Sequence, residues 1–249
     1  MDYHEQAEGE RPDASSSRSS REVDLQEHQV DEYTRKLWEG FRDPYVSTRV
    51  LTCAAGLLQK DFEVIAAPTV SEANRIIVDR VDRHNSIYFW STTLEELGII
   101  DTLRARGNSV RSSLELSGER GFIGLRPRKP GRSDIYMTSV SAITLDGVLL
   151  NLAPEGASVF PPGPAPGTII VVAGHNKIVD DLDEGIQRSR DICFPQYARL
   201  LGLDLPCVRV ARCIECDTPH ALCTVNTVIT RKPAGTDFLV VLIGEHLGF

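Results

Sequence analysis

Four cysteines near the carboxyl end of the sequence have the residue type and the close spacing of a metal site. They are Cys207, Cys213, Cys216 and Cys223, in the pattern C-x5-C-x2-C-x6-C. The C-x2-C pair places two thiolates on one tight turn, and the flanking cysteines, or His220 between them, can complete a shell for zinc or for an iron–sulfur cluster. The spacing matches neither the usual zinc-finger pattern nor the common ferredoxin patterns. The alternatives are reduced cysteines packed in a loop, or a redox-active pair at Cys213 and Cys216.

A second group of polar residues follows the most apolar run of the chain. The β-branched run 168–173 predicts a buried strand, and Gly174, Asn176 and Lys177 come just after it. Glycine permits a close approach of the backbone, while the amide of Asn176 and the cation of Lys177 suit a phosphate or a carboxylate. The alternative is a plain helix start, in which Gly174 makes the turn and Asn176 is the N-cap.

Hydroxyl and amide side chains also follow other predicted strands. Ser91 and Thr92 open a helix, where hydroxyls and free backbone N–H groups can form an anion site. Ser139 ends a predicted strand, and Asn151 follows a predicted hairpin. All four side chains can instead satisfy neighbouring backbone groups, as caps and turn residues commonly do. The candidate ligand-binding residues are Ser91, Thr92, Ser139, Asn151, Gly174, Asn176 and Lys177.

The sequence lacks the common catalytic motifs. It contains no P-loop, GxGxxG, GxSxG or HExxH pattern, and its six histidines are scattered. P-loop nucleotide hydrolysis and serine hydrolase chemistry therefore have no support. The catalytic residues are unknown. Glu95, Asp146 and Glu245 are candidate general bases only because they flank the polar segments.

The elements that must position these residues alternate between helix and strand. Apolar periodicity predicts helices over 46–58, 71–81, 94–104 and 182–201. Strands are predicted over 62–66, 86–90, 108–111, 134–139, 168–173, 224–231 and 238–243, with a hairpin over 142–150. This order indicates an α/β fold with an open, mostly parallel sheet flanked by helices, and with a closing hairpin of the last two strands. Ligands bind such sheets beyond the carboxyl ends of the strands, where the polar segments lie. Cys53 and Cys193 fall in helical patterns and are expected in the core.

Composition predicts one folded domain behind an acidic tail. Residues 1–32 are rich in serine and carry ten acidic and three basic side chains, which is nearly all of the net charge of −8. They predict a disordered tail, and 33–249 the folded domain. The nearly neutral remainder disfavours nucleic-acid binding, and no apolar run approaches the ~20 residues of a membrane helix. Without signal-peptide features the chain is expected to be cytoplasmic, where six cysteines indicate metal or redox use rather than disulfides.

The sequence resembles the LUD domain family, the lactate-utilisation proteins of the B and C type. The segments that carry the resemblance are ITLDG at 143–147, VVAGHNKIV at 171–179, the cysteine cluster, LIGEHLGF at 242–249 and TTLEELGIIDTL at 92–103. The resemblance covers about residues 45–249. Without the ferredoxin-like cysteine repeats of the larger B-type proteins, the chain is most similar to a stand-alone C-type domain.

The resemblance implies a fold related to ribose-5-phosphate isomerase, glucosamine-6-phosphate deaminase and CoA transferases. It also implies a role linked to the oxidation of L-lactate to pyruvate. One expected function is a domain that binds a small anionic metabolite, as an enzyme or an accessory component. The alternative is an accessory subunit without catalysis of its own, which carries a metal or iron–sulfur cluster and docks on an oxidoreductase or iron–sulfur partner protein. Two departures from the family, the proline-rich loop after Asn151 and His175, touch the expected pocket.

Overall fold

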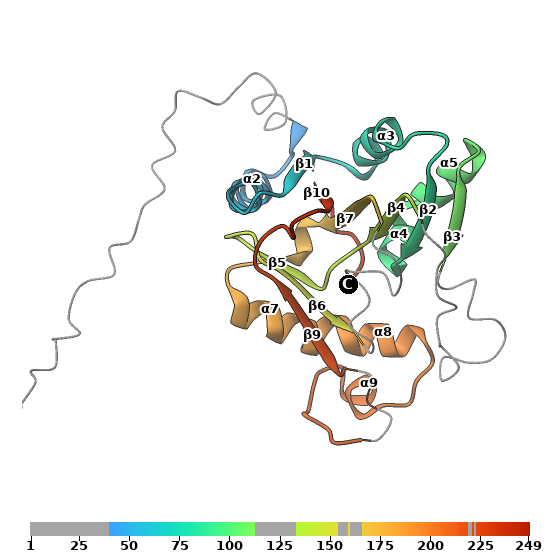
Figure 1. Cartoon of the computed structure of the whole chain (residues 1–249). Coiled ribbons are helices and arrows are strands. Elements are labelled where there is room, and N and C mark those ends of the chain that lie inside the picture. Colours follow the sequence, from blue (N-terminus) through green and yellow to red (C-terminus); the bar gives the residue numbers. More distant parts are fainter. Residues whose placement is uncertain (1–39, 113–132, 154–158, 160–165, 219–220, 222) are drawn as a thin grey trace, which may run out of the picture.

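The computed structural model describes residues 40–112, 133–153, 159, 166–218, 221 and 223–249 (Figure 1). The predicted acidic tail and His220 lie outside the described residues. Within those residues, no helix combines the length and the apolar character needed to cross a membrane.

The centre of the fold is an open sheet of six parallel strands, which confirms the α/β prediction. The strand order is β1-β10-β7-β4-β2-β3. Val241 of β10 pairs with Ile65 of β1 and with Val172 of β7, so the last strand lies inside the sheet. The strands are β1 (Glu63–Ala67), β2 (Ser86–Trp90), β3 (Ser109–Ser112), β4 (Ile135–Thr138), β7 (Thr168–Gly174) and β10 (Asp237–Ile243).

Successive side chains of these strands enter two different cores, as the period of two along a strand requires. On β4, Tyr136 packs into one core, whereas Ile135 and Met137 pack into the other. The second core is covered by α3 (Val70–Arg80), α4 (Thr92–Leu97) and α5 (Ile99–Ala105). The single helix predicted over 94–104 is wrong, because Gly98 adopts a φ of 72° and separates α4 from α5.

The opposite face of the large sheet is covered by α2 (Pro44–Gln59) and by a second, four-stranded sheet. The small sheet has the order β8-β5-β6-β9. Its strands are β5 (Ala142–Thr144), β6 (Leu149–Ala153), β8 (Ile178–Val179) and β9 (Val225–Ile229). The predicted closing hairpin is wrong, because β9 pairs with β6 while β10 lies between β1 and β7. After its first residue, Asp237, β10 is apolar and buried, which suits a central strand, whereas the largely exposed β9 suits an edge.

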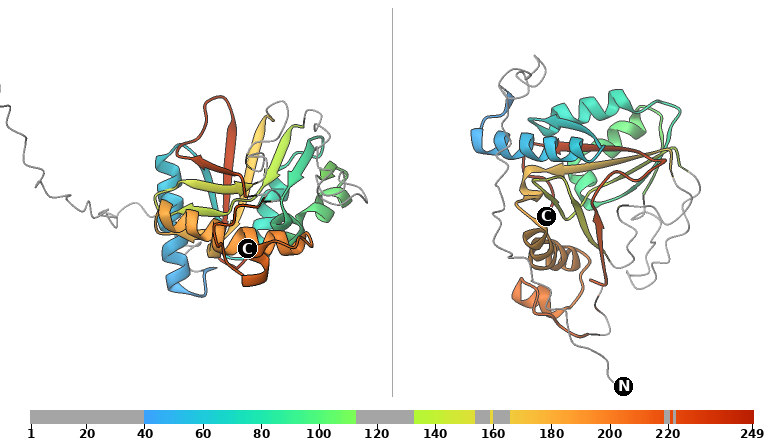
Figure 2. Two further views of the ribbon diagram at one scale, coloured as in Figure 1. Left: turned by 90° about the horizontal axis from the view of Figure 1, so that it is seen from below. Right: turned by 60° about the vertical axis from the view of Figure 1, so that its left-hand side comes forward.

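A helical layer covers the far side of the small sheet. It consists of α7 (Leu182–Arg188), the π-helix η3 (Ser189–Cys193) and α8 (Phe194–Leu200), and α9 (Pro206–Val210) follows. Ile186 of α7 packs against Leu150 and Val179 of the small sheet. Figure 2 (right) shows the resulting layers, with α3 and α5 above the large sheet and α7 and α8 below the small one.

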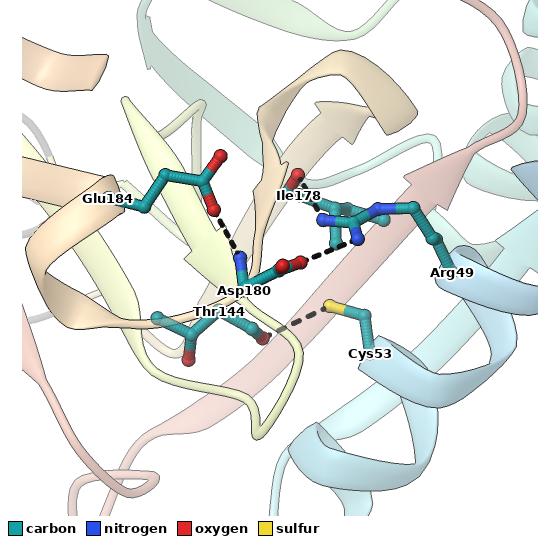
Figure 3. Close-up of polar contacts among 6 residues, drawn as sticks. All are labelled: Arg49, Cys53, Thr144, Ile178, Asp180 and Glu184. Atoms are coloured by element: carbon teal, nitrogen blue, oxygen red, sulfur yellow. Dashed lines mark hydrogen bonds and ion pairs between the residues drawn. The ribbon is translucent and has the colours of Figure 1, made fainter. Parts of the chain in front are cut away.

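Helix α2 attaches the small sheet to the rest of the fold (Figure 3). The guanidinium of Arg49 donates to Asp180 Oδ1 at 2.6 Å and to the carbonyl of Ile178 at 3.0 Å. The thiol of Cys53 lies 3.6 Å from the carbonyl oxygen of Thr144, and its burial raises its pKa to about 12. Cys53 is thus buried in the core, as expected.

Candidate anion-binding site

Lys177 is the centre of the candidate site. It ends η2 (His175–Lys177), the short 3-10 turn that leads from β7 of the large sheet to β8 of the small one. Its side chain is 2% exposed, and Nζ donates to Thr93 Oγ1 at 3.0 Å and to Ser139 Oγ at 2.9 Å. No carboxylate among the described residues forms an ion pair with it. The buried amine is therefore held by two neutral hydroxyls, and its protonated form has no counter-ion at hydrogen-bond distance among the described residues.

These contacts lie at the point where the strand order of the large sheet reverses. From β2 the chain continues through α4 and α5 to β3 on one side, whereas from β4 it continues to β7 on the other. Thr93 follows β2 and Ser139 follows β4, so Lys177 reaches the carboxyl ends of the two strands that flank this switch point. Open α/β sheets bind their ligands at such a position.

The surroundings of Lys177 change its acid–base chemistry. Burial lowers the pKa of Lys177 from its ordinary value of 10.5 to about 8. Cys193 opposes this change, the charge of Arg188 lowers the pKa further, and Glu96 opposes it. Near neutral pH the amine can therefore anchor an anion in its charged form and act as a nucleophile in its neutral form.

Arg188 is a second buried cation beside Lys177. Its side chain is 8% exposed, and Nε donates to the carbonyl of Asn176 at 3.0 Å. Nη1 donates to the carbonyl of Ser141 and contacts Cys193 Sγ at 2.8 Å, while Nη2 bonds to none of the described residues. Within the described part of the chain, neither cation has a carboxylate partner. Two adjacent buried cations without a counter-ion are an arrangement suited to an anionic ligand.

The last residues of the chain close over the site. Asn176 donates from Nδ2 to the carbonyl of Gly248 at 3.0 Å and accepts the N–H of Leu247 at 3.0 Å. Glu96 accepts the N–H of Gly248 at 3.0 Å. Gly248 has a φ of 64°, and a β-carbon on it would overlap Thr93 Oγ1 and lie 3.2 Å from Lys177 Nζ. Asn176 therefore holds the carboxyl-terminal segment through two hydrogen bonds. It is not the N-cap that the sequence also allowed, because η2 has no side-chain cap.

Four other predicted site residues lie near the ends of β2, β6 and β7. Ser91 is the N-cap of α4 and accepts the N–H of Thr93 at 3.1 Å, and Thr92 is the first residue of that helix. Gly174 ends β7 beneath the carboxyl-terminal segment, where a β-carbon would lie 2.6 Å from the nitrogen of Leu247. Asn151 lies on β6 and accepts from Ser141 Oγ at 3.3 Å, and the carbonyl of Ser141 accepts from Arg188.

The candidate general bases do not contact Lys177. Asp146 pairs with Lys60 at 3.2 Å on the hairpin turn next to α2. Glu245 accepts the N–H of Val70 at 2.7 Å, and Glu95 is exposed on α4. No described residue is therefore assigned as a base.

Sequence reasoning missed Thr93, Arg188 and Cys193. Thr93 directly follows the predicted site residues Ser91 and Thr92. Nothing in the sequence indicates that Thr93, and not the other two, bonds to Lys177. Arg188 shares the buried face of α7 with Gly185, three residues earlier, which is the one signal that marks it. Cys193 is buried as expected, yet its thiol also donates to the carbonyl of Ser141 at 3.4 Å and so belongs to the surroundings of the site.

A cavity of about 430 Å³ lies at the opposite, amino edge of the large sheet. Asp134, Thr168 and Asp237 line it where β4, β7 and β10 begin. None of the predicted site residues lines this cavity. Since ligands of parallel sheets bind at the carboxyl edge, the surroundings of Lys177 remain the better candidate.

The four carboxyl-terminal cysteines form a separate group around α9, which Figure 1 shows at the lower edge of the fold. Burial raises the pKa of Cys207, and the charges of Cys216 and Cys223 raise it further, so these thiols are electrostatic neighbours. All four are free thiols. Over the described residues, no three histidine, cysteine, aspartate or glutamate side chains come together in an arrangement that could hold a metal ion.

Comparison with known proteins identifies the family. No curated protein matches the chain. Among solved structures, a DUF162 family protein from Deinococcus radiodurans is similar at 12% sequence identity and a TM-score of 0.41, over 80% of this chain and 97% of that one. The model of the LUD domain family matches residues 54–243, from within α2 to the last residue of β10. Because this match spans most of the sequence, the chain belongs to the LUD domain family.

Proposed function

We propose that this LUD domain binds a small anionic metabolite at the carboxyl edge of its large sheet, with Lys177 as the anchor. The observation that carries the proposal is the burial of Lys177 and Arg188 without a described carboxylate partner. An uncompensated buried charge costs a protein several kcal/mol. Such charges are concentrated at functional sites, where a ligand supplies the opposite charge.

The ligand we propose is a short carboxylate of the lactate and pyruvate type. The resemblance to the lactate-utilisation proteins supports this choice. So does the proximity of the two cations: Arg188 bonds to the carbonyl of Asn176, the residue before Lys177, and its charge lowers the pKa of Lys177. The domain would act in lactate utilisation either as an enzyme or as an accessory component. The metal-bearing accessory subunit has less support, because the described cysteines do not converge.

Titration calorimetry with lactate, pyruvate and inorganic phosphate tests the proposal. We expect the full chain to bind at least one of these anions and Lys177→Met to lose about tenfold or more in affinity, the worth of one charge-assisted hydrogen bond. Lys60→Met is the matched control, because it removes a lysine that pairs with Asp146 away from the site. Equal affinity of Lys177→Met and the unchanged chain, or no binding of any of the three anions, would refute the proposal.

A further inference from the structure

We infer that Lys177 forms an imine with the carbonyl group of a 2-oxo acid whose carboxylate is held by Arg188. This inference rests on the proposed anion site, and it adds the substrate class and a covalent step. It is carried by the hydrogen bonds around Nζ and by the position of the guanidinium next to it.

The hydrogen bonds of Lys177 match a neutral amine. An ammonium has three N–H donors, but Nζ has two acceptors, the hydroxyls of Thr93 and Ser139. A neutral amine has two N–H donors, which these two hydroxyls satisfy, and one lone pair, which stays available. The nucleophilic form of the side chain is therefore the one whose hydrogen bonds are complete in this structure.

Two further features support a nucleophilic lysine. Desolvation and a neighbouring cation are the devices that activate lysines for imine formation. Lys177 has both, since it is 2% exposed and lies next to Arg188. Accordingly its pKa falls to about 8, so a useful fraction of the amine is neutral near physiological pH.

The position of Arg188 selects the substrate class. Its Nε bonds to the carbonyl of Asn176, so the guanidinium lies against the backbone that carries Lys177. Its Nη2 makes no bond to the described residues and can accept a carboxylate oxygen as partner. In a 2-oxo acid the carboxylate is bonded directly to the carbonyl carbon, which suits two adjacent cations. A sugar phosphate places its anion several bonds away from its carbonyl and suits them less well.

The step balances without an oxidant or a reductant. The lone pair of Nζ attacks the carbonyl carbon, and one amine proton moves to the carbonyl oxygen, which gives a carbinolamine. The second amine proton and the hydroxyl group then leave as water while the C=N bond forms. The hydroxyls of Ser139 and Thr93, both within 3.0 Å of Nζ, can carry these protons between nitrogen and oxygen.

Gly248 packs closely against the amine and Thr93. A β-carbon at this position would overlap Thr93 Oγ1 and lie 3.2 Å from Nζ, so any other residue here would displace the amine or the hydroxyl that it bonds. The same glycine is held by Asn176 and Glu96, which fixes the carboxyl-terminal segment over the site.

The test is reductive trapping with pyruvate. The full chain is incubated with pyruvate and sodium cyanoborohydride, and the modified residues are mapped by peptide mass spectrometry. We expect one adduct on Lys177, no adduct at Lys60, and none in Lys177→Arg, whose guanidinium cannot form the imine. Acetone, which has the carbonyl but no carboxylate, is expected to be trapped at least tenfold more slowly.

Other outcomes separate this inference from the proposed function. Calorimetric binding of pyruvate without a trapped adduct would refute the imine and leave the anion site standing. Neither binding nor trapping would refute both. Equal labelling of Lys60 and Lys177, or equal trapping of acetone and pyruvate, would show unselective chemistry and overturn the inference. Arg188→Lys keeps the positive charge and is expected to retain part of the trapping that Arg188→Met loses, while circular dichroism reports whether each variant is folded.

Discussion

The Nζ atom of Lys177 lies 2.9 Å from Oγ of Ser139, although the two residues follow different strands of the large sheet. The strands are β7 and β4, which are adjacent and parallel, with Thr138 opposite Val171. Because both strands point the same way, their following loops meet at one edge. The contact that defines the candidate site is thus a direct product of the strand order.

Ser139→Ala should destabilise the fold moderately. The substitution removes one of the two acceptors of a buried amine, so we expect the free energy of unfolding at pH 7 to fall by about 1 kcal/mol or somewhat more. Urea denaturation measures this change. Ser109→Ala, at an exposed position of β3, is the control and should be nearly neutral. Equal effects of the two substitutions would mean that the contact with Lys177 carries no net stability.

The lowered pKa of Lys177 should make stability rise with pH. Between about pH 8 and its ordinary value of 10.5, the amine is neutral in the folded chain and protonated in the unfolded chain. The unfolded state then binds more protons, so the free energy of unfolding increases with pH in this window, by about 1 kcal/mol per pH unit.

Lys177→Met cannot titrate and isolates this contribution from those of all other groups. The difference in unfolding free energy between the unchanged chain and Lys177→Met should therefore grow in favour of the unchanged chain from pH 8 to pH 10. Urea denaturation at several pH values measures it. A constant difference across the window would contradict a lowered pKa.

Gly248→Ala should disturb the site by more than its backbone strain. Gly248 and Gly202 have φ values of 64° and 67°, so alanine is strained to a similar degree at both. A β-carbon at Gly202 meets open space, whereas one at Gly248 overlaps Thr93 Oγ1. We expect Gly202→Ala to cost about 1 kcal/mol and Gly248→Ala at least 1 kcal/mol more. Thermal unfolding compares the two variants. Equal losses of stability would show that the carboxyl-terminal segment moves to accommodate the β-carbon at no energetic cost.

The cysteine thiols should react in two classes. Cys213, Cys216 and Cys223 are partly exposed, while Cys53, Cys193 and Cys207 are buried. With a chromogenic disulfide reagent we expect three thiols to react quickly and three only after unfolding.

The arrangement of the cysteines also predicts that protein purified without oxygen contains well below one equivalent of zinc or iron. Plasma mass spectrometry and the visible spectrum check this expectation. A stoichiometric metal, or the absorption of an iron–sulfur cluster, would contradict it and would mean that the four cysteines rearrange around an ion.

Local patterns predicted the strands but not all of their partners. The apolar runs that form β2, β7 and β10 are evident in the sequence, because a strand buried on both faces needs a continuous apolar segment. Which strands pair is decided by the whole sheet, so the proximity of the last two strands in sequence wrongly indicated a hairpin. The break at Gly98 was missed for a related reason, because periodicity continues across one left-handed residue.

The candidate site was predicted in part. Gly174, Asn176 and Lys177 were identified because polar residues directly after a buried strand must lie at the sheet edge. Ser139 was identified in the same way. Arg188 was missed, since its helical spacing from Gly185 marks only a buried face, and the contact with Asn176 forms only in the folded chain. Contacts between layers leave no periodic signal in a sequence.

The turn that ends at Lys177 is also one of the chain connections between the two sheets, since β7 precedes it and β8 follows it. A ligand bound by Lys177, Thr93 and Ser139 would restrict the movement of one sheet relative to the other. The molecule would then become more rigid when the site is occupied. Amide hydrogen exchange in β5, which pairs with β8, would slow on binding. Removal of the Arg49 side chain, which donates to the carbonyl of Ile178 next to Lys177, would weaken ligand binding without touching the ligand.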